Sequence, residues 1–337
     1  MKKVTIYDVA EASGVAPSTV SRAFSSPGRV NAATRERVVA AAQELGYRPK
    51  HEFGAARSSR SRTIAMVLAD ITNPHFFEFI RGAEQRAKAA QHTLVLVNAE
   101  ESPQIELAQI RELSAKVDGF VLASSRLPDH ELQYLSRDRK LVLLNRDVEG
   151  LASVKLDMES GCRQILEHLA SLGHTEFTYC AGPPASWMGT TRWAELSAGA
   201  AAHGLTAHRI GPYAPTVASG GAAADAALRT NPTALVAHND LLAIGILRRL
   251  AVRGVRVPED MSLVGFDNNF AADLVGVPLT TLGGPGAEVG RRAVEMLLHS
   301  IDEQPERMGA LTDPPNDRIL LPTELFIRSS SGPVRAG

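Results

Sequence analysis

The chain has 337 residues, with 36 basic residues, 37 acidic residues and 44% hydrophobic residues. Its length exceeds that of one ordinary domain, and its apolar fraction excludes an intrinsically disordered chain. Two cysteines, Cys162 and Cys180, are too few for a disulfide framework or a four-cysteine zinc site, and no apolar run reaches the ~18 residues of a membrane span.

The net charge of −1 conceals a difference between the two ends of the chain. Residues 1–62 hold eleven basic and five acidic residues, a net charge of +6, which leaves −7 on residues 63–337. A basic segment on an acidic body is the electrostatic pattern of a module that meets phosphate. An ordinary solvated basic surface is the alternative, so local structure has to decide between the two interpretations.

Two short helices separated by a glycine turn are predicted at the start of the basic segment. Thr5 and Asp8 have the spacing of a capping box, in which a Thr oxygen accepts from a backbone N–H and the acid favours the positive end of the helix. This first helix is expected to end at Gly14. Pro17 suits the first turn of the second helix, which follows a link of three residues.

A third, supporting helix is predicted after Asn31, whose side chain can cap it. Its apolar stripe consists of Val38, Ala42 and Leu45, and it is expected to end at Gly46. This succession is the helix-turn-helix pattern, whose second helix enters the major groove of DNA. The exposed face of that helix carries hydroxyls and a guanidinium that can contact phosphates and base edges: Ser18, Thr19, Ser21 and Arg22. A three-helix bundle without a ligand is the alternative.

The motifs of this segment run without a gap over some fifty residues, TIYDVAEASGVAPSTVSRAF followed by VNAATRERVVAAAQELGYRPK. They strongly resemble the DNA-binding headpiece of the lactose-repressor (LacI–GalR) family, and we assign residues 1–48 to such a headpiece. The resemblance implies that three residues read bases, namely Pro17, Ser18 and Arg22. It also implies backbone-positioning contacts from Tyr7, Thr19, Ser21 and Asn31.

Residues 49–62 are predicted to link the headpiece to the rest of the chain. Members of the family have a short helix here that inserts a leucine into the minor groove and kinks the operator. The corresponding residue in this chain is Ala56, or Ser59 if three residues are inserted, and neither is a large apolar side chain. Arg57 can contact phosphate. A flexible linker is the alternative, so operator kinking stays open.

Beyond the linker, short apolar runs such as TIAMVLA, TALVAH and RILLP alternate with helix-length amphipathic segments. This alternation predicts two α/β lobes with parallel sheets covered on both faces by helices. We expect residues 63–156 plus 285–316 to form the first lobe and residues 157–284 plus 317–330 to form the second. Residues 331–337 are a tail.

Motifs typical of enzymes are missing from the sequence. It contains no G-x-G-x-x-G after a predicted strand, no phosphate-binding loop, no H-E-x-x-H and no G-x-S-x-G. We therefore predict no catalytic residue, no cofactor and no bound metal.

Polar side chains follow several predicted strands, where open α/β sheets bind their ligands. Carboxylate, amide, guanidinium and nearby aromatic groups suit a polyhydroxylated ligand, and a nucleobase uses much the same chemistry. The candidates chosen by position are Asp70, Asn145, Arg146, Trp187, Arg192, Asn239 and Asp267. Structural alternatives exist, because Asn239 can cap a helix and Phe76 can pack in a core.

The resemblance to the LacI–GalR family extends through TNPHFFEFIRGAE, LLNRD, AHNDLLAIGIL and VPEDMSLVGFDN. It implies a two-lobed effector domain similar to periplasmic sugar-binding proteins. It also implies that six residues line the effector pocket, namely Phe76, Asn145, Arg146, Arg192, Asn239 and Asp267. The R-x-x-G-F motif that is usual in the family is replaced by RWAEL at residues 192–196. The last residues of the chain, SSSGPVRAG, contain no leucine heptads, which predicts that the tetramer-forming extension of the lactose repressor is absent.

These features predict a homodimeric, cytoplasmic transcriptional repressor that binds a palindromic DNA operator through two headpieces. A small molecule between the lobes, expected to be a sugar, would control the affinity for the operator. A nucleoside or a phosphorylated carrier protein is the alternative regulator. The alternative function is that of a solute-binding protein that serves a transporter. Two features count against it, namely the helix-turn-helix and the acidic residues Asp8 and Glu11, which stand where an export signal needs its apolar stretch.

Overall fold

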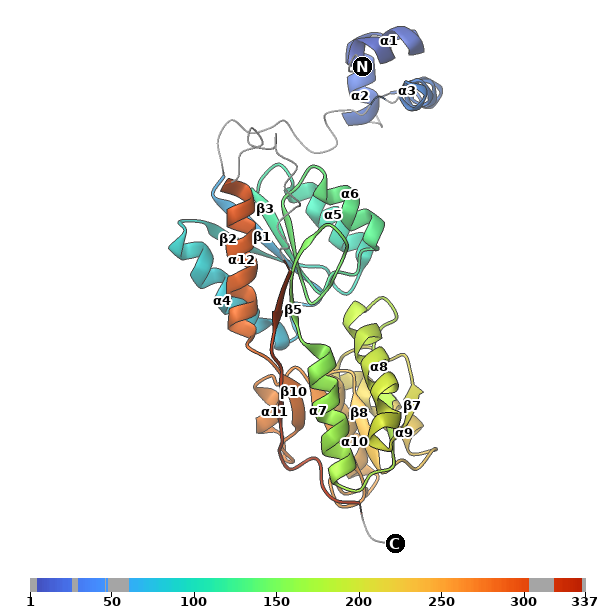
Figure 1. Cartoon of the computed structure of the whole chain (residues 1–337). Helices are drawn as coiled ribbons and strands as arrows, with labels where there is room; N and C mark the ends of the chain where they lie inside the picture. Colours follow the sequence, from blue (N-terminus) through green and yellow to red (C-terminus); the bar gives the residue numbers. More distant parts are fainter. Residues whose placement is uncertain (1–4, 26–29, 46, 48–60, 303–317, 335–337) are drawn as a thin grey trace. The chain divides into compact units, whose positions relative to one another are not determined.

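The computed structural model describes residues 5–25, 30–45, 47, 61–302 and 318–334. They form a small unit that contains the first helices and a large unit that contains most of the chain from Arg62 onward (Figure 1). Among the described residues, no helix combines the length and the apolar character needed to span a membrane.

Three helices form the small unit, as the sequence predicts: α1 (Ile6–Ser13), α2 (Pro17–Ser25) and α3 (Ala32–Glu44). At the start of α1, the Asp8 carboxylate accepts hydrogen bonds from the Thr5 N–H and hydroxyl, both at 2.6 Å. At its end Gly14 adopts a φ of 66°, which favours glycine. Asn31 caps α3 by accepting from the Ala33 N–H at 3.0 Å.

The core of the small unit takes one fully buried valine from each helix: Val9, Val20 and Val38. Leu45 was predicted to join this core, but it lies beyond the end of α3 and is 38% exposed, so that prediction is wrong. The predicted helix end at Gly46 lies outside the described residues, as do Ala56, Arg57 and Ser59 of the predicted linker.

The first lobe of the large unit is a six-stranded sheet in the order β11-β5-β4-β3-β1-β2, with every pair parallel. Its strands are β1 (Thr63–Leu68), β2 (Thr93–Asn98), β3 (Gly119–Ala123), β4 (Leu141–Leu144), β5 (Ala152–Leu156) and β11 (Arg318–Leu321). One face is covered by α4 (His75–Ala89) and α12 (Gly286–Asp302), and the other by α5 (Pro103–Leu113) and α6 (Asp129–Ser136) (Figure 1).

Strand β11 corrects the predicted lobe boundary. It pairs with β5 in a register that runs from Arg318 beside Ser153 to Leu321 beside Leu156. Residues 318–321 therefore belong to the first lobe, and their predicted assignment to the second lobe is wrong. The run RILL is apolar enough to predict a strand, but a strand's pattern does not identify a partner so distant in sequence.

The second lobe is a six-stranded sheet in the order β12-β10-β9-β8-β6-β7, in which only β12 and β10 are antiparallel. Its strands are β6 (Glu176–Cys180), β7 (Thr206–Ile210), β8 (Ala234–Ala237), β9 (Ser262–Phe266), β10 (Thr280–Gly283) and β12 (Glu324–Phe326). Its longer helices are α7 (Met158–Ser171), α8 (Trp187–Ala200), α9 (Gly220–Ala227) and α10 (Asp240–Val252), and the short α11 (Ala271–Leu274) follows β9.

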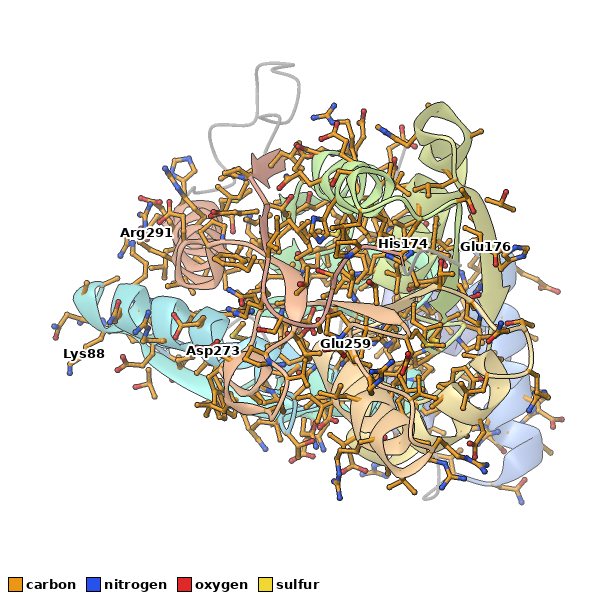
Figure 2. All side chains as sticks on the ribbon, turned by 90° about the horizontal axis from the view of Figure 1, so that it is seen from below. Lys88, His174, Glu176, Glu259, Asp273 and Arg291 are labelled. Atoms are coloured by element: carbon orange, nitrogen blue, oxygen red, sulfur yellow. The ribbon has the colours of Figure 1, made fainter. Side chains whose placement is uncertain are left out.

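Helices α4 and α12 lie side by side and pack through glycines. A Cβ at Gly82 of α4 would lie 1.8 Å from the Ala287 carbonyl oxygen, and one at Gly290 of α12 would lie 1.9 Å from the Phe79 carbonyl oxygen. The two backbones therefore approach more closely than any side chain would permit. The opposite faces of the helices point outward, as Lys88 and Arg291 show in Figure 2.

Three crossover segments connect the lobes, namely the one after Leu156, the one from Gly283 to Gly286, and the one between Leu321 and Glu324. The strands within each sheet are mainly parallel, so their carboxyl ends lie at one edge. The loops after β1, β3 and β4 of the first lobe share a cavity with the loops after β6, β8 and β9 of the second. The fold thereby gathers side chains that are far apart in sequence.

Candidate functional site

Helix α2 carries five of the residues predicted to contact DNA, namely Pro17, Ser18, Thr19, Ser21 and Arg22. Ser18 and Arg22, one helical turn apart, are both exposed, whereas Val20 and Ala23 point into the core. The others are Tyr7, which is 70% exposed, the half-buried Pro17, Thr19 and Ser21, and the exposed Asn31. This exposure fits the predicted contacts. Arg57 lies outside the described residues.

A polar cleft lies between the two lobes of the large unit. It is lined by Asn73, His75, Phe76, Glu101, Ser124, Arg126, Asn145, Ser186, Met188, Arg192, Pro215, His238, Asn239 and Asp267. The free space among these side chains is only about 40 Å³. The polar cleft is therefore rich in hydrogen-bonding groups but narrow.

Arg192 and Asp267 form the buried ionic pair of the polar cleft. The Arg192 Nη2 donates to Asp267 Oδ1 at 3.0 Å, and its Nη1 donates to the His238 carbonyl oxygen at 2.5 Å. The guanidinium lies 4.4 Å from the centroid of the Phe266 ring. Both side chains are shielded, with exposures of 7% and 3%, so their attraction is screened little by water. The Nε of Arg192 has no hydrogen-bond partner.

Two further titratable groups surround Asp267. The His75 Nδ1, from the first lobe, lies 3.5 Å from Asp267 Oδ1 of the second. Burial lowers the pKa of His75, although the charge of Asp267 acts in the opposite direction. Burial, reinforced by the nearby Asp267, raises the pKa of Asp240 well above its usual range. A protonated, hence cationic, His75 would form an ion pair that joins the lobes.

The first lobe contributes amide and guanidinium groups to the polar cleft. Asn145 follows β4 with a φ of 53° and is 1% exposed, and its Oδ1 has no hydrogen-bond partner. Arg126 follows β3, where its Nε and Nη2 bind the Glu101 carboxylate at 2.6 and 3.0 Å. Its Nη1 donates to the Ser124 carbonyl oxygen at 3.0 Å. Asn145 thus retains a free acceptor, while Arg126 is held by its partners.

The second lobe contributes His238 and Asn239 after β8. The His238 Nδ1 lies 3.1 Å from the hydroxyl of Tyr179, and burial lowers the pKa of His238 well below its usual value. The ring packs against Gly182 and Gly189, where an added Cβ would lie 2.5 and 3.1 Å from it. Asn239 caps α10 by accepting from the Leu242 N–H at 3.0 Å, so its structural alternative is confirmed.

A larger cavity of about 320 Å³, which we call the crossover chamber, adjoins the polar cleft. Its lining comes from α4, the crossover segments and the loop after β9: Pro74, His75, Phe77, Glu78, Phe79, Leu156, Met158, Arg192, Phe266, Asp267, Asn268, Asn269, Phe270, Leu282, Gly283, Gly284 and Gly286. His75, Arg192 and Asp267 line both cavities, so they form a shared wall.

The structure brings five of the predicted effector residues to the polar cleft: Phe76, Asn145, Arg192, Asn239 and Asp267. Three others line neither cavity. Asp70 accepts hydrogen bonds from the Thr72 N–H and hydroxyl in a turn. Arg146 donates to the Asp129 carboxylate and to the Ser125 carbonyl oxygen. The Trp187 ring centroid lies 5.8 Å from the Lys155 ammonium. Their predicted role lacks support because each side chain is engaged outside the cleft.

Several lining residues were not singled out from the sequence, namely His75, Arg126, His238 and Asn269. His75 and His238 lie inside the motifs TNPHFFEFIRGAE and AHNDLLAIGIL, directly beside Phe76 and Asn239, but they were not predicted as site residues. Arg126 lies three residues beyond β3, in a segment for which the sequence analysis predicted no site residue. Asn269 becomes noticeable only because its Nδ2 is buried without a partner, which requires the structure.

Metal-ligating and reactive groups do not gather here. No cluster of three or more His, Cys, Asp or Glu that could hold a metal ion occurs in the described part of the chain. Cys162 and Cys180 are buried and free, and burial raises the pKa of each thiol to about 12. Such thiols are inert at neutral pH.

Comparison with known protein families matches two regions. Residues 5–50 match the model of bacterial regulatory proteins of the lacI family, and residues 166–331 match a periplasmic binding protein-like domain. The first region contains α1 to α3, and the second contains most of the second lobe.

Similar proteins align over nearly the whole chain. The transcriptional regulator DegA of Bacillus subtilis is 30% identical over 98% of this chain and 99% of its own length. The transcriptional repressor CytR of Escherichia coli is 32% identical over 97% of this chain and 96% of its own. These relatives are named as regulators of transcription rather than as enzymes.

Solved structures of similar fold also align with nearly the whole chain. The regulator CelR in complex with cellobiose is 28% identical, covers 97% of this chain and all of its own, and has a TM-score of 0.71. The lac repressor dimer bound to operator and the anti-inducer ONPF is 27% identical, covers 98% of this chain and all of its own, and has a TM-score of 0.69. With its helix-turn-helix headpiece and two α/β lobes, the chain belongs to the lacI family of bacterial regulatory proteins.

Proposed function

We propose that this protein is a repressor that binds a palindromic operator as a homodimer. In this proposal, a polyhydroxylated small molecule bound between the lobes controls the affinity of the repressor for that operator. The observation that carries the proposal is the occurrence, in one chain, of an exposed recognition helix and a polar cleft built around a buried Arg192–Asp267 pair. A solute-binding protein has no use for the recognition helix.

In this proposal α2 enters the major groove. Its Arg22 guanidinium can bond guanine O6 and N7 with two parallel hydrogen bonds, and the Ser18 hydroxyl can reach a base edge or a phosphate. The two headpieces of a two-fold dimer then meet two half-sites of inverted sequence. The positive charge of residues 1–62 supplies the attraction to phosphate that does not depend on sequence.

The polar cleft explains how a ligand and the lobe arrangement are linked. A space of about 40 Å³ is far below the ~300 Å³ of typical ligand pockets, so a sugar has to displace existing contacts before it binds there. One such contact is that of His75 with Asp267, which joins the two lobes. A ligand that changes this contact favours one lobe arrangement over the other, which is the thermodynamic requirement for control of a distant site.

The class of ligand follows from the groups available. Free acceptors such as Asn145 Oδ1, together with the Asp267 carboxylate, suit the hydroxyls of a sugar. The CelR structure contains cellobiose, and a lacI-family regulator from Enterococcus faecium, 27% identical with a TM-score of 0.67 and 81% of this chain covered, contains ribose. A nucleoside or a phosphocarrier protein remains the alternative regulator.

The DNA-binding part is tested by selecting an operator from a random DNA library with the full chain. We expect an inverted repeat, and we expect Arg22→Ala to lose ~1–3 kcal/mol of discrimination at one base position in each half-site. Arg137→Ala, an exposed arginine of the first lobe, is the matched control and should leave binding unchanged. Unaltered affinity and base preference in Arg22→Ala would show that α2 is not the recognition helix.

The ligand-binding part is tested by thermal-shift measurements with ribose, cellobiose and nucleosides, followed by operator-release assays. Asp267→Ala should abolish both the thermal shift and the release caused by the active compound. Asp70→Ala is the control, because Asp70 lines neither cavity. An Asp267→Ala protein with an intact response contradicts the proposed site.

A further inference from the structure

We propose that the crossover chamber is a binding site for a planar aromatic ring that carries a hydrogen-bond acceptor at its edge, as one part of a ligand whose polyhydroxylated part reaches the polar cleft. This inference rests on the proposed ligand-controlled function and specifies it. The chamber, at about 320 Å³, has the volume of a small-molecule site, whereas the polar cleft, at about 40 Å³, does not.

The two cavities share part of their lining. His75, Arg192 and Asp267 line both, so a ligand with one part in each cavity would contact these three side chains. On the side of the polar cleft it meets amide and carboxylate groups that suit hydroxyls. On the side of the chamber it meets a different chemistry.

Part of the chamber wall consists of flat, apolar phenylalanine rings. Phe77 of α4 and Phe270 of the loop after β9 stack across the two lobes, with ring centroids 6.3 Å apart and planes inclined by 17°. These rings are 46% and 62% exposed, an unusual state for phenylalanine, while Phe79 and Phe266 are buried in the wall behind them. Stacking with a third ring would cover the exposed aromatic surface.

Two donors without acceptors belong to residues that line the chamber. The Arg192 Nε and the Asn269 Nδ2 are both buried and lack a hydrogen-bond partner. The other polar atoms of Asn269 are in use, because its Oδ1 accepts from the Ala271 N–H at 2.9 Å and its own N–H donates to Asp240. Buried donors are rarely left unsatisfied, so these two favour a ligand that brings acceptors.

The crossover segment from Gly283 to Gly286 leaves the chamber empty of side chains on that wall. A Cβ at Gly286 would lie 2.8 Å from the Glu78 Cβ and 3.1 Å from the Phe79 ring. A Cβ at Gly284 would lie 2.5 Å from a Leu156 methyl carbon. The glycines thus let backbone approach the other walls, and no side chain of this segment occupies the volume offered to a ring.

The experiment uses ring fragments, so that it does not depend on which sugar is recognised. Binding of adenine and nicotinamide to the full chain is measured by saturation-transfer NMR and titration, with cyclohexanol as the non-planar comparison. We expect the planar rings to bind at least about tenfold more tightly than cyclohexanol. Phe270→Ala removes one exposed wall, and Asn269→Ser removes the Nδ2 donor while its hydroxyl can still cap Ala271.

Each of these two variants should weaken ring binding about tenfold. Leu274→Ala, an equally exposed apolar residue of α11 that does not line the chamber, should change nothing. The proposal is overturned if neither ring binds better than cyclohexanol, or if both variants bind the rings as the parent does. If the ring fragments do not bind but a plain sugar still releases the operator, the ring-binding proposal is wrong and the proposed function stands. The failure of one proposal can therefore be distinguished from the failure of the other.

Two sources of such a ring are then compared, a nucleoside (adenosine) and an aryl glycoside (4-nitrophenyl β-D-glucopyranoside). A ligand that reaches both cavities should bind more tightly than its ring alone, and this gain should disappear in Asp267→Asn. The compound that shows both effects identifies the source. If neither compound exceeds its ring fragment, the extension into the polar cleft is wrong.

Discussion

The Nδ1 of His238 and the hydroxyl of Tyr179 lie 3.1 Å apart in the second lobe, and neither ring is open to solvent. The Tyr179 hydroxyl can donate to Nδ1, and in that arrangement the proton of the neutral imidazole resides on Nε2. The stacked Trp193 ring, 5.9 Å away, holds the tyrosine in place. In this arrangement Tyr179 fixes the tautomer of a histidine that lines the polar cleft.

Replacement of Tyr179 by phenylalanine should remove this control of the tautomer. Because the Nδ1 of a buried imidazole loses its partner, we expect the free energy of unfolding to fall by ~1–3 kcal/mol in urea titrations. Nitrogen-15 NMR of labelled histidine should show a single Nε2-protonated form in the parent and a mixture in Tyr179→Phe. Tyr134→Phe, a change at an exposed tyrosine, is the control. An unchanged spectrum contradicts the assignment.

The histidines predict a loss of stability in mild acid. Burial lowers the pKa of His75, His168, His174 and His238, so the unfolded chain binds protons more readily than the folded one below about pH 6.5. The free energy of unfolding should therefore fall as the pH drops from 7 to 5, by at most about 1.4 kcal/mol per pH unit for each histidine. His168→Gln should reduce this slope, with the exposed His130→Gln as the control.

A second window of instability is expected in stronger acid. Hydrogen bonds from Arg249 lower the pKa of Asp225 to about 2, and those from Arg291 do the same for Glu288. The stability that these carboxylates contribute is present above pH ~4 and is lost as the pH falls towards 2. Asp225→Asn should flatten the pH dependence in this window only. A change above pH 5 instead would contradict the assignment.

The buried Arg192–Asp267 pair of the second lobe should also matter for folding. Asp267→Ala leaves the Arg192 guanidinium buried with no carboxylate, and removing one partner of such a pair costs ~3–5 kcal/mol. Asp267→Asn keeps an oxygen that can accept from Arg192, so we expect a smaller loss in urea titrations of both variants. Equal losses would show that charge rather than hydrogen bonding holds Arg192.

The glycine contact between α4 and α12 gives a matched pair of substitutions. Gly290→Ala would place a Cβ 1.9 Å from the Phe79 carbonyl oxygen and should destabilise the protein by ~1–3 kcal/mol or more. Gly221→Ala in α9 meets nothing within 4 Å and should stabilise it by up to ~1 kcal/mol, because alanine favours the helix. Thermal unfolding of both variants measures the difference, and equal effects would contradict the close approach.

Local signals explain what the sequence could predict. The caps at Thr5, Gly14 and Asn31 lie within a few residues of the helices they bound, and the structure has those helix ends. Strand β7 was missed because Thr206–Ile210 is an edge strand with no buried residue and no apolar run. Strand β12 has only three residues, too few for any pattern.

The sequence predicted only part of the candidate site, because a sequence pattern can identify the ends of strands but not the directions of side chains. Arg192 and Asp267 were found by position, although their pairing joins residues 75 apart. Arg146 was misplaced because its neighbour Asn145 has a φ of 53°, which changes the course of the backbone after β4. The chamber could not be predicted at all, because its volume depends on how three distant segments approach one another.

The route of the chain through the first lobe has a consequence for synthesis on the ribosome. Its sheet needs β11, and one of its covered faces needs α12, and both are translated after every strand of the second lobe except β12. The edge of β5 and the apolar side of α4 therefore lack their partners until residue 321 has left the exit tunnel. The three headpiece helices follow one another at the start of the chain and can form early, whereas each lobe waits for a late strand, the first for β11 and the second for β12. A stalled or truncated nascent chain would thus expose an open sheet edge, the form most prone to aggregation.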